Sequence, residues 1–210
     1  MSLHFDDNNN AENVIAFATN AVTNKIVTNL CVSEDEGDGQ QQSVKLEKDY
    51  KFALAPRKLS EKERSVLFVA GESGSGKSYF TREYVKRYNQ MFPNNPIYLI
   101  LYLDEDKTLD AYKKIIRLNC MTDEFLYDCQ EFDLKAEFGN SFVIFDDIDS
   151  IAEKKAKEII FALLNKLLRI GRHFNTSVAY VGHELYSNHE LKVILNESHT
   201  ITFFSKILEF

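Results

Sequence analysis

One octapeptide constrains the fold of this 210-residue chain more than any other part of its sequence. It is a complete GxxxxGK(S/T) pattern, Gly71-Glu72-Ser73-Gly74-Ser75-Gly76-Lys77-Ser78. An apolar run over 65–70 precedes it, and a helix-compatible stretch over 79–86 follows it. Glycines let successive backbone N–H groups face an oxyanion, and the start of the following helix adds positive partial charge. The pattern in this context predicts a loop that binds the phosphates of a nucleotide.

Two side chains of this loop have distinct expected roles. Lys77 is expected to reach the β- and γ-phosphates, and Ser78 is expected to hold Mg²⁺. ATP and Mg²⁺ are therefore the predicted ligands, although these residues do not decide between ATP and GTP. The competing interpretation is a chance match in an ordinary loop, which the flanking strand and helix disfavour.

A second segment ends in acids. Four large apolar residues, 142–145, are followed by Asp146 and Asp147, which indicates a buried strand that ends at the catalytic edge. Asp146 is placed to bind Mg²⁺, because hard cations prefer carboxylate oxygens. Asp147 is expected to point the other way along the strand, where it can orient or deprotonate a water. The alternative is a solvated turn, and Asp149 is expected to be the N-cap of a helix that begins near Ile151.

A third segment joins the end of a helix to another strand. Arg172 follows the helix, and His183 follows the apolar run 177–181. In ATPases with an extra strand between the phosphate-loop strand and the acidic strand, the tip of that strand senses the γ-phosphate, and His183 fits this position. A solvent-facing histidine is the alternative. Arg172 is expected either to cap the helix against its dipole or to face the nucleotide of a neighbouring subunit.

From residue 65 onward, apolar runs alternate with helical stretches. The helix over 152–170 is the clearest, because its apolar residues recur at i, i+3 and i+4. Continuous apolar strands separated by helices predict an α/β fold with a mostly parallel sheet covered on both faces. The expected strands are 65–70, 97–103, 142–145, 177–181 and 200–204.

The first part of the chain has a different pattern. Residues 1–10 resemble a loose terminus, and the β-prone runs 13–18 and 25–32 predict a hairpin. The polar, acidic stretch 33–43 is typical of a linker, and 50–55 predicts a short strand. We therefore expect a small β-rich segment over 1–60 and the phosphate-loop core over 61–210.

The net charge of −7 is unevenly distributed. Residues 1–44 hold seven acids and one base, which leaves about −1 for the other 166 residues. Bulk charge therefore argues neither for nor against binding to nucleic acid. A basic cluster over 45–64, which ends at Arg64, is interleaved with acids and favours a solvated surface over a contact with a phosphate backbone.

Cysteine usage and the N-terminus favour a cytoplasmic location. Cys31, Cys120 and Cys129 are odd in number and lack metal-ligand spacing, so we expect buried, reduced thiols. The chain has no apolar run long enough to span a membrane and no signal-peptide pattern. No membrane partner is expected.

The order of these segments resembles the FtsK/HerA branch of the P-loop ATPases, in particular the DNA-packaging ATPases of large double-stranded DNA viruses. The resemblance covers about residues 65–204 and implies a RecA/ASCE-like core. The matching residues are Gly71, Gly76, Lys77 and Ser78 in the loop, Asp146 and Asp147 in the acidic pair, and Arg172 after the helix. His183 stands where the family usually has Gln, and 196–204 lack the arginine of some members. The chain ends just past the last core strand, so we expect a short or truncated member.

Three functions are compatible with these features. The resemblance implies an ATPase motor, assembled as a ring of identical subunits, that acts on viral double-stranded DNA with capsid components. A slow, nucleotide-regulated switch or scaffold is the second, because Asp147 stands where many P-loop ATPases have Glu. A small-molecule kinase is the third. The adjacent acids favour attack by water instead, and Arg82, Arg87 and Arg117 form no cluster of the kind found in a kinase lid.

Overall fold

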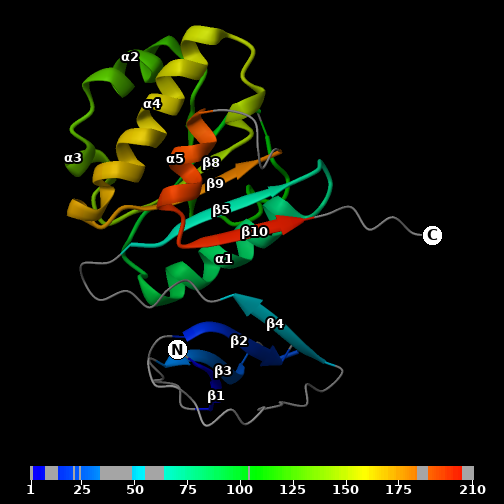
Figure 1. Ribbon diagram of the computed structural model, residues 1–210. Helices are drawn as coiled ribbons and strands as arrows, with labels where there is room; N and C mark the ends of the chain where they lie inside the picture. Colours follow the sequence, from blue (N-terminus) through cyan, green and yellow to red (C-terminus); the bar gives the residue numbers. More distant parts are fainter. Residues whose placement is uncertain are drawn as a thin grey trace. The chain divides into compact units, whose positions relative to one another are not determined.

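The computed structural model divides the chain into two compact units, Met1–Lys58 and Leu59–Phe210 (Figure 1). It describes residues 2–7, 14–20, 22–23, 25–33, 49–54, 64–103, 105–183 and 189–204. Of the expected linker over 33–43, Ser33 belongs to a strand and the rest lies outside the described residues, as do most of the basic cluster and Asn8, Asn9 and Asn10.

The first unit contains a four-stranded antiparallel sheet. Its strands are β1 (Ser2–Asp6), β2 (Val14–Asn20), β3 (Ile26–Ser33) and β4 (Tyr50–Leu54), in the order β1-β3-β2-β4. The predicted hairpin is confirmed, because β2 pairs with β3 and the Asn20 amide donates to the Lys25 carbonyl at 3.0 Å. The expectation of a loose terminus is wrong for Ser2–Asp6, which pairs in full with β3.

The second unit is built on a six-stranded parallel sheet, which confirms the predicted α/β class. Its order is β10-β5-β9-β8-β6-β7. The central strands are β5 (Val66–Gly71), β9 (Ser177–Gly182) and β8 (Phe142–Asp146), and every residue of these three strands is buried. The others are β6 (Ile97–Leu101), β7 (Ile115–Asn119) and β10 (Thr200–Phe204). Strand β9 pairs with β5 on one side and β8 on the other, so the expected extra strand is present.

Helices cover both faces of this sheet (Figure 1). Helix α1 (Lys77–Met91) lies on one face, where Tyr84 and Tyr88 pack with Leu67 of β5. Helices α2 (Asp123–Glu131), α3 (Leu134–Phe138), α4 (Lys154–Ile170) and α5 (His189–Glu197) cover the other. Phe68, the neighbour of Leu67 in β5, belongs to this second cluster, because successive side chains of a strand point to opposite faces.

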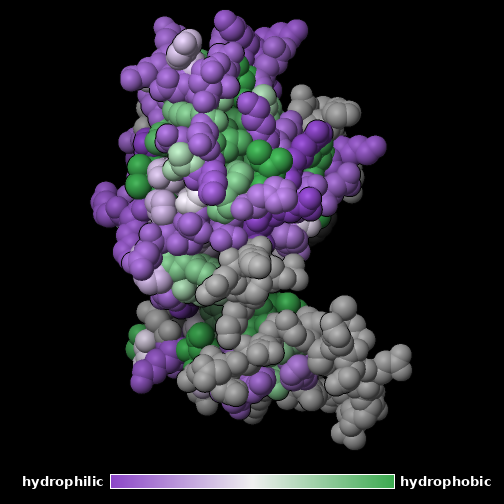
Figure 2. Space-filling view, turned by 90° about the vertical axis from the view of Figure 1, so that its left-hand side faces the viewer, coloured by the Kyte–Doolittle hydropathy of each residue, from purple (hydrophilic) through white to green (hydrophobic). Residues whose placement is uncertain are grey.

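The visible surface of the second unit is mostly hydrophilic, with hydrophobic residues gathered in patches between the polar ones (Figure 2). Within the described ranges, none of the helices combines the length and the apolar character needed to cross a bilayer. All three cysteines are buried and free, as the sequence predicted.

A buried arginine ties the start of β5 to the helices that cover the sheet. Arg64 is 5% exposed, and its guanidinium donates to the carbonyls of Leu167 and Leu168 in the last turn of α4. It also pairs with Glu197 of α5 at 3.4 Å. Burial lowers the pKa of Arg64, Glu197 raises it, and nearby Arg172 lowers it. Arg64 is thus neither solvated nor peripheral, and it satisfies carbonyls that Arg172 was expected to cap.

Arg64→Met should lower the free energy of unfolding by about 2–4 kcal/mol, because two buried carbonyls lose a charged donor and Glu197 loses its partner. Urea denaturation of the full chain measures this loss. The matched control is Arg172→Met, which removes an exposed arginine and should change stability by less than about 0.5 kcal/mol. Equal losses in the two variants would contradict the assignment.

Candidate nucleotide-binding site

The phosphate loop lies between β5 and α1 and depends on three glycines. Gly71, Gly74 and Gly76 have φ angles of 151°, 75° and 100°, in the region that disfavours residues with a Cβ. A Cβ on Gly71 would also lie 2.4 Å from the Phe204 carbonyl oxygen of β10. The loop therefore has both the conformation and the close backbone approach that its sequence predicted.

The start of α1 is suited to an anion. Gly76 is its N-cap, no side chain caps the first turn, and that turn contains no acidic residue. Residues 72–74 are exposed, and a Cβ on Gly74 would meet nothing within 4 Å. Ser75 Oγ is buried and has no hydrogen-bond partner among the described residues. Open helix N–H groups and an orphaned hydroxyl are the features expected where phosphate oxygens bind.

Lys77 is held inside this loop. It is 7% exposed, and its Nζ donates to the carbonyls of Gly71 at 2.8 Å and Glu72 at 3.0 Å. The same Nζ lies 3.5 Å from Nδ1 of His183. The lysine predicted for phosphate contact is thus brought next to the histidine predicted to act as sensor.

Asp146 ends β8 in a buried position between β6 and β9. It pairs in register with Leu101 and Val181 and is 2% exposed. Burial, and then the negative charges of Asp147 and Asp106, raise its pKa from an ordinary 3.8 to about 8, while Lys77 opposes the rise. A divalent cation would offset this crowding of negative charge. With half-buried Ser78 in the first turn of α1, these residues fit Mg²⁺, which prefers oxygen ligands.

Asp147 does not continue the strand as expected. It has a left-handed φ of 52°, and its amide donates to the Val181 carbonyl of β9 at 3.3 Å. Its Oδ1 lies 2.8 Å from Nε2 of His183. An imidazole that donates from Nε2 and accepts at Nδ1 satisfies both Asp147 and the Lys77 ammonium. The turn after β8 therefore aims the second acid at the tip of the neighbouring strand.

Asp149 is not a helix N-cap. It lies in a 3-10 turn, η1 (Ile148–Ser150), and its Oδ2 accepts from the backbone amide of His183 at 3.1 Å. Helix α4 begins at Lys154, and Glu153 provides the N-cap by accepting from the Ala156 amide at 2.9 Å. Two acids of one turn therefore hold His183, one by its side chain and one by its backbone.

Sequence reasoning missed Asp106, which follows β6 and adds negative charge near Asp146. The signal was available, because β6 runs parallel to β8 and its following acids had to come to the same edge of the sheet. Asp106 Oδ1 also accepts from the amides of Thr108 and Leu109, at 2.7 and 2.8 Å. Asp106 therefore stabilises the conformation of the loop after β6 and also adds negative potential near Asp146.

Arg172 is the one predicted site residue that the structure does not bring to the phosphate loop. It lies exposed in the 3-10 turn η2 (Gly171–Phe174), which precedes β9. The phosphate loop and His183 follow their strands, so they lie at the opposite, carboxyl edge of the sheet. The length of β9 separates the two edges by about 17 Å.

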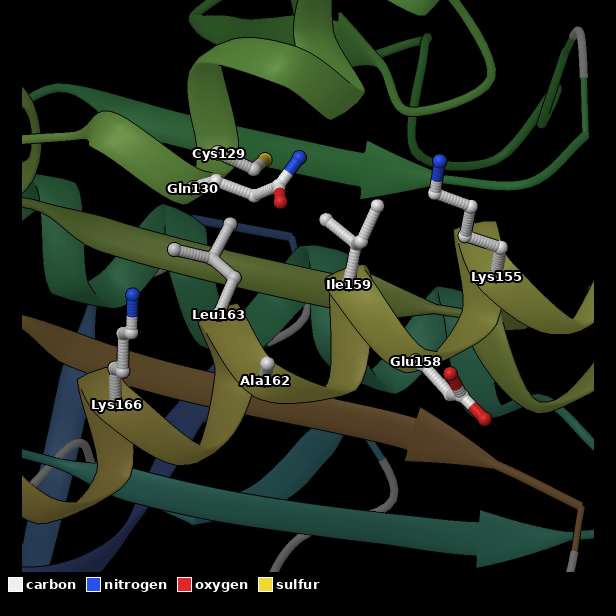
Figure 3. Close-up of a pocket in the computed structure, with 8 residues that line it drawn as sticks. All are labelled: Cys129, Gln130, Lys155, Glu158, Ile159, Ala162, Leu163 and Lys166. Carbon is white, nitrogen blue, oxygen red and sulfur yellow. The ribbon is translucent and has the colours of Figure 1, made fainter.

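A pocket of about 240 Å³ lies elsewhere in the second unit, between α2 and α4 (Figure 3). Cys129 and Gln130 line it from α2, and Lys155, Leu163 and Lys166 are among the lining residues from α4. None of its lining residues belongs to the phosphate loop or the acidic turn, so it is not assigned to the nucleotide.

Known proteins place the chain by sequence and by fold. No family model matches it. The "uncharacterized protein V3" of Sputnik virophage is 30% identical over 177 residues, which span 83% of this chain and 68% of V3. The chain belongs to the V3 family.

The fold of this V3-family member is also similar to that of solved structures. The cytoplasmic domain of EssC has a TM-score of 0.50 and 14% identity, and the match covers 95% of this chain and 37% of that one. The genome packaging NTPase B204 of Sulfolobus turreted icosahedral virus 2, in complex with AMP, has a TM-score of 0.41 and 14% identity. That match covers 70% of this chain and 77% of B204.

Asp146→Asn should change the pH dependence of stability in the metal-free protein. A carboxyl group whose folded pKa is raised binds its proton more tightly in the folded state, so its contribution to stability falls as pH rises from about 4 to about 8. Asn removes this loss, and the melting temperature of the variant relative to wild type should therefore increase between pH 5 and pH 8. Thermal unfolding in the presence of a metal chelator measures this difference in melting temperature. The control is Asp128→Asn, which changes an exposed carboxylate. A difference independent of pH would contradict the burial of an ionisable Asp146.

Proposed function

We propose that this V3-family protein is an ATPase that uses Mg²⁺ and works as a ring-shaped motor on double-stranded DNA during viral genome packaging. The observation that carries the ATPase part is the continuous contact Lys77–His183–Asp147 beside the buried carboxylate of Asp146. In this proposal Lys77 is the phosphate-binding cation and Asp147 is the base for water, and both lie at one edge of one sheet. The viral assignment is supported by V3, which is a virophage protein.

Each residue has a role in this proposal. The loop amides and Lys77 hold the phosphates, and Ser78 and Asp146 hold Mg²⁺, which when bound would neutralise charge on the phosphate oxygens. His183 Nε2–H holds one carboxylate oxygen of Asp147, and the other oxygen accepts the proton of the attacking water. His183 also lies against the Lys77 ammonium, so the position of Asp147 is coupled to occupation of the phosphate loop.

The arrangement disfavours a small-molecule kinase. Such an enzyme usually needs mobile arginines over an acceptor pocket, but two of the three candidates form ion pairs with nearby acids. Arg82 pairs with Glu83 at 2.9 Å, and Arg117 pairs with Asp110 at 2.6 Å. Arg87 Nη1 donates to Gln90 on the same helix. These pairs leave no cluster of arginines among the three candidates.

A slow nucleotide-dependent switch is the second candidate. The observation that favours it is that Lys77 already donates to two loop carbonyls and Asp147 is already engaged by His183. When phosphate and water bind, the Lys77 ammonium has to leave or share its loop carbonyls, and Asp147 has to accept from water as well as from His183. These rearrangements would slow hydrolysis. Steady turnover that rises with DNA distinguishes the motor from this switch.

The position of Arg172 supports assembly with further copies. An arginine at the amino edge of the sheet cannot reach the phosphate loop of its own subunit, but it can reach one on a neighbour. A ring with ATP at each interface satisfies this geometry. Capsid components are the further proposed partners, and the cytoplasm, a viral factory or the virion is the proposed location.

Asp147→Asn should abolish ATP turnover while leaving ATP binding within about threefold of wild type, because Asn keeps the shape but accepts no proton. Phosphate release with and without double-stranded DNA, and ATP binding by calorimetry, measure the two effects. Lys77→Ala is the comparison variant and should lose binding. If wild type released no phosphate above background under either condition, the ATPase proposal would be wrong. Turnover that does not change when DNA is added would support an ATPase and contradict the proposal of a DNA motor.

Arg172→Ala and Asp147→Asn should complement each other if Arg172 acts on a neighbouring subunit. Each variant alone should be inactive, but in a random equal mixture about a quarter of the interfaces join an intact Asp147 to an intact Arg172. Phosphate release by the mixture should therefore recover to about that fraction of wild type. Arg169→Ala, which removes a nearby exposed arginine of α4, is the control and should be active alone. Failure of the mixture to recover would exclude action across an interface.

A further inference from the structure

Three side chains able to bind a metal come together on the sheet of the first unit, away from the predicted nucleotide site in sequence. His4 and Asp6 are two residues apart on β1, so both lie on one face of the strand. Pairing with β3 places Cys31 directly opposite His4. One ligand atom from each residue lies within 4.8 Å of the other two. We propose that His4, Asp6 and Cys31 bind one Zn²⁺ ion.

The donor set and its spacing suit zinc. Zn²⁺ binds imidazole nitrogen, carboxylate oxygen and thiolate sulfur at about 2.0–2.3 Å, which in a tetrahedron places ligand atoms about 3.4–3.7 Å apart. The ligand atoms already lie within 4.8 Å of one another, and side-chain rotation would bring them closer to this spacing. Mg²⁺ disfavours nitrogen and sulfur ligands, so the set also selects against the cation of the nucleotide site. His4 and Asp6 are half-buried, which leaves the fourth position open to water.

The charges of the cluster would balance around a divalent cation. Binding of Zn²⁺ would deprotonate the Cys31 thiol, release its proton to solvent and form the sulfur–zinc bond. One thiolate, one carboxylate and a neutral imidazole then cancel the two positive charges, which a half-buried ion requires.

The backbone holds the three ligands in this register. Asp6 pairs with Asn29 of β3, and Asn29 Nδ2 donates to the Asp6 carbonyl at 3.1 Å. Strand β1 is an edge strand whose one partner in the sheet is β3. Zinc would therefore join an edge strand to its neighbour in a unit, Met1–Lys58, of the size at which a small core benefits from a metal.

The test uses the full, tag-free chain. Wild type should retain one Zn²⁺ per chain by elemental analysis after dialysis, and Co²⁺ in its place should give a thiolate charge-transfer band and tetrahedral d–d bands. Cys31→Ser should lose the thiolate band and bind Zn²⁺ more than about 100-fold more weakly, which exceeds the cost of losing an outer-shell partner. His4→Ala changes a half-buried residue and should weaken binding to a similar degree, so the result does not depend on the folding of the Cys31 variant alone.

Matched controls distinguish this site from other places where zinc could bind. Cys129→Ser, which changes a buried thiol of α2, and His173→Ala, which changes an exposed histidine of η2, should both keep one zinc per chain. Asp147, Asp149 and His183 form the other group of possible ligands among the described residues. Zinc lost from His183→Ala but kept by Cys31→Ser would overturn the proposal. Wild type that holds no zinc and shows no cobalt–thiolate band would overturn it as well.

Discussion

The hydrogen bonding of β9 between β5 and β8 is the constraint on which the candidate site depends. Because all three strands are parallel, their carboxyl ends meet at one edge, and the segment that follows each strand must lie beside the other two. The phosphate loop follows β5, the acids follow β8, and His183 follows β9. The contacts among Lys77, His183 and Asp147 are thus a consequence of strand order, and a sheet without β9 in this place would separate them.

The sequence predicted the parts of the fold in which burial is complete and failed where it is partial. Continuous apolar runs marked β5, β8 and β9, because a strand buried on both faces has no polar positions. Strand β7 was not predicted, since it is an edge strand with Ile116 48% exposed and a charged residue, Arg117, in its middle. Strand β1 was missed for a related reason: it carries two polar, half-buried residues, His4 and Asp6, and therefore has no continuous apolar run. The position of Arg64 could not be predicted either, because its partners, Leu167 and Leu168, are more than a hundred residues away.

Two buried charged side chains of the second unit, Arg64 and Asp146, differ in how their burial is compensated. Arg64 has donors matched to two helix carbonyls and a carboxylate, so its burial is compensated inside the protein. Asp146 is crowded by further acids, and Lys77 alone among the named contributors to its pKa favours its charged form. Uncompensated burial of a carboxylate supports the proposal that Asp146 binds a cation, and it does so without reference to any motif.

Strand pairing also explains why spacing rules find one ligand set and overlook another. The phosphate loop is contiguous, so its eight residues suffice to identify it, whereas His4, Asp6 and Cys31 become neighbours through the register of β1 on β3. The same reasoning applies to Arg172, whose distance from its own phosphate loop follows from the direction of β9 and not from its distance along the chain. A parallel sheet fixes which edge each loop occupies, so an arginine at the amino edge can serve a nucleotide only on another copy. Under the proposed function a catalytic role for Arg172 therefore requires assembly, since no rotation of one side chain spans about 17 Å.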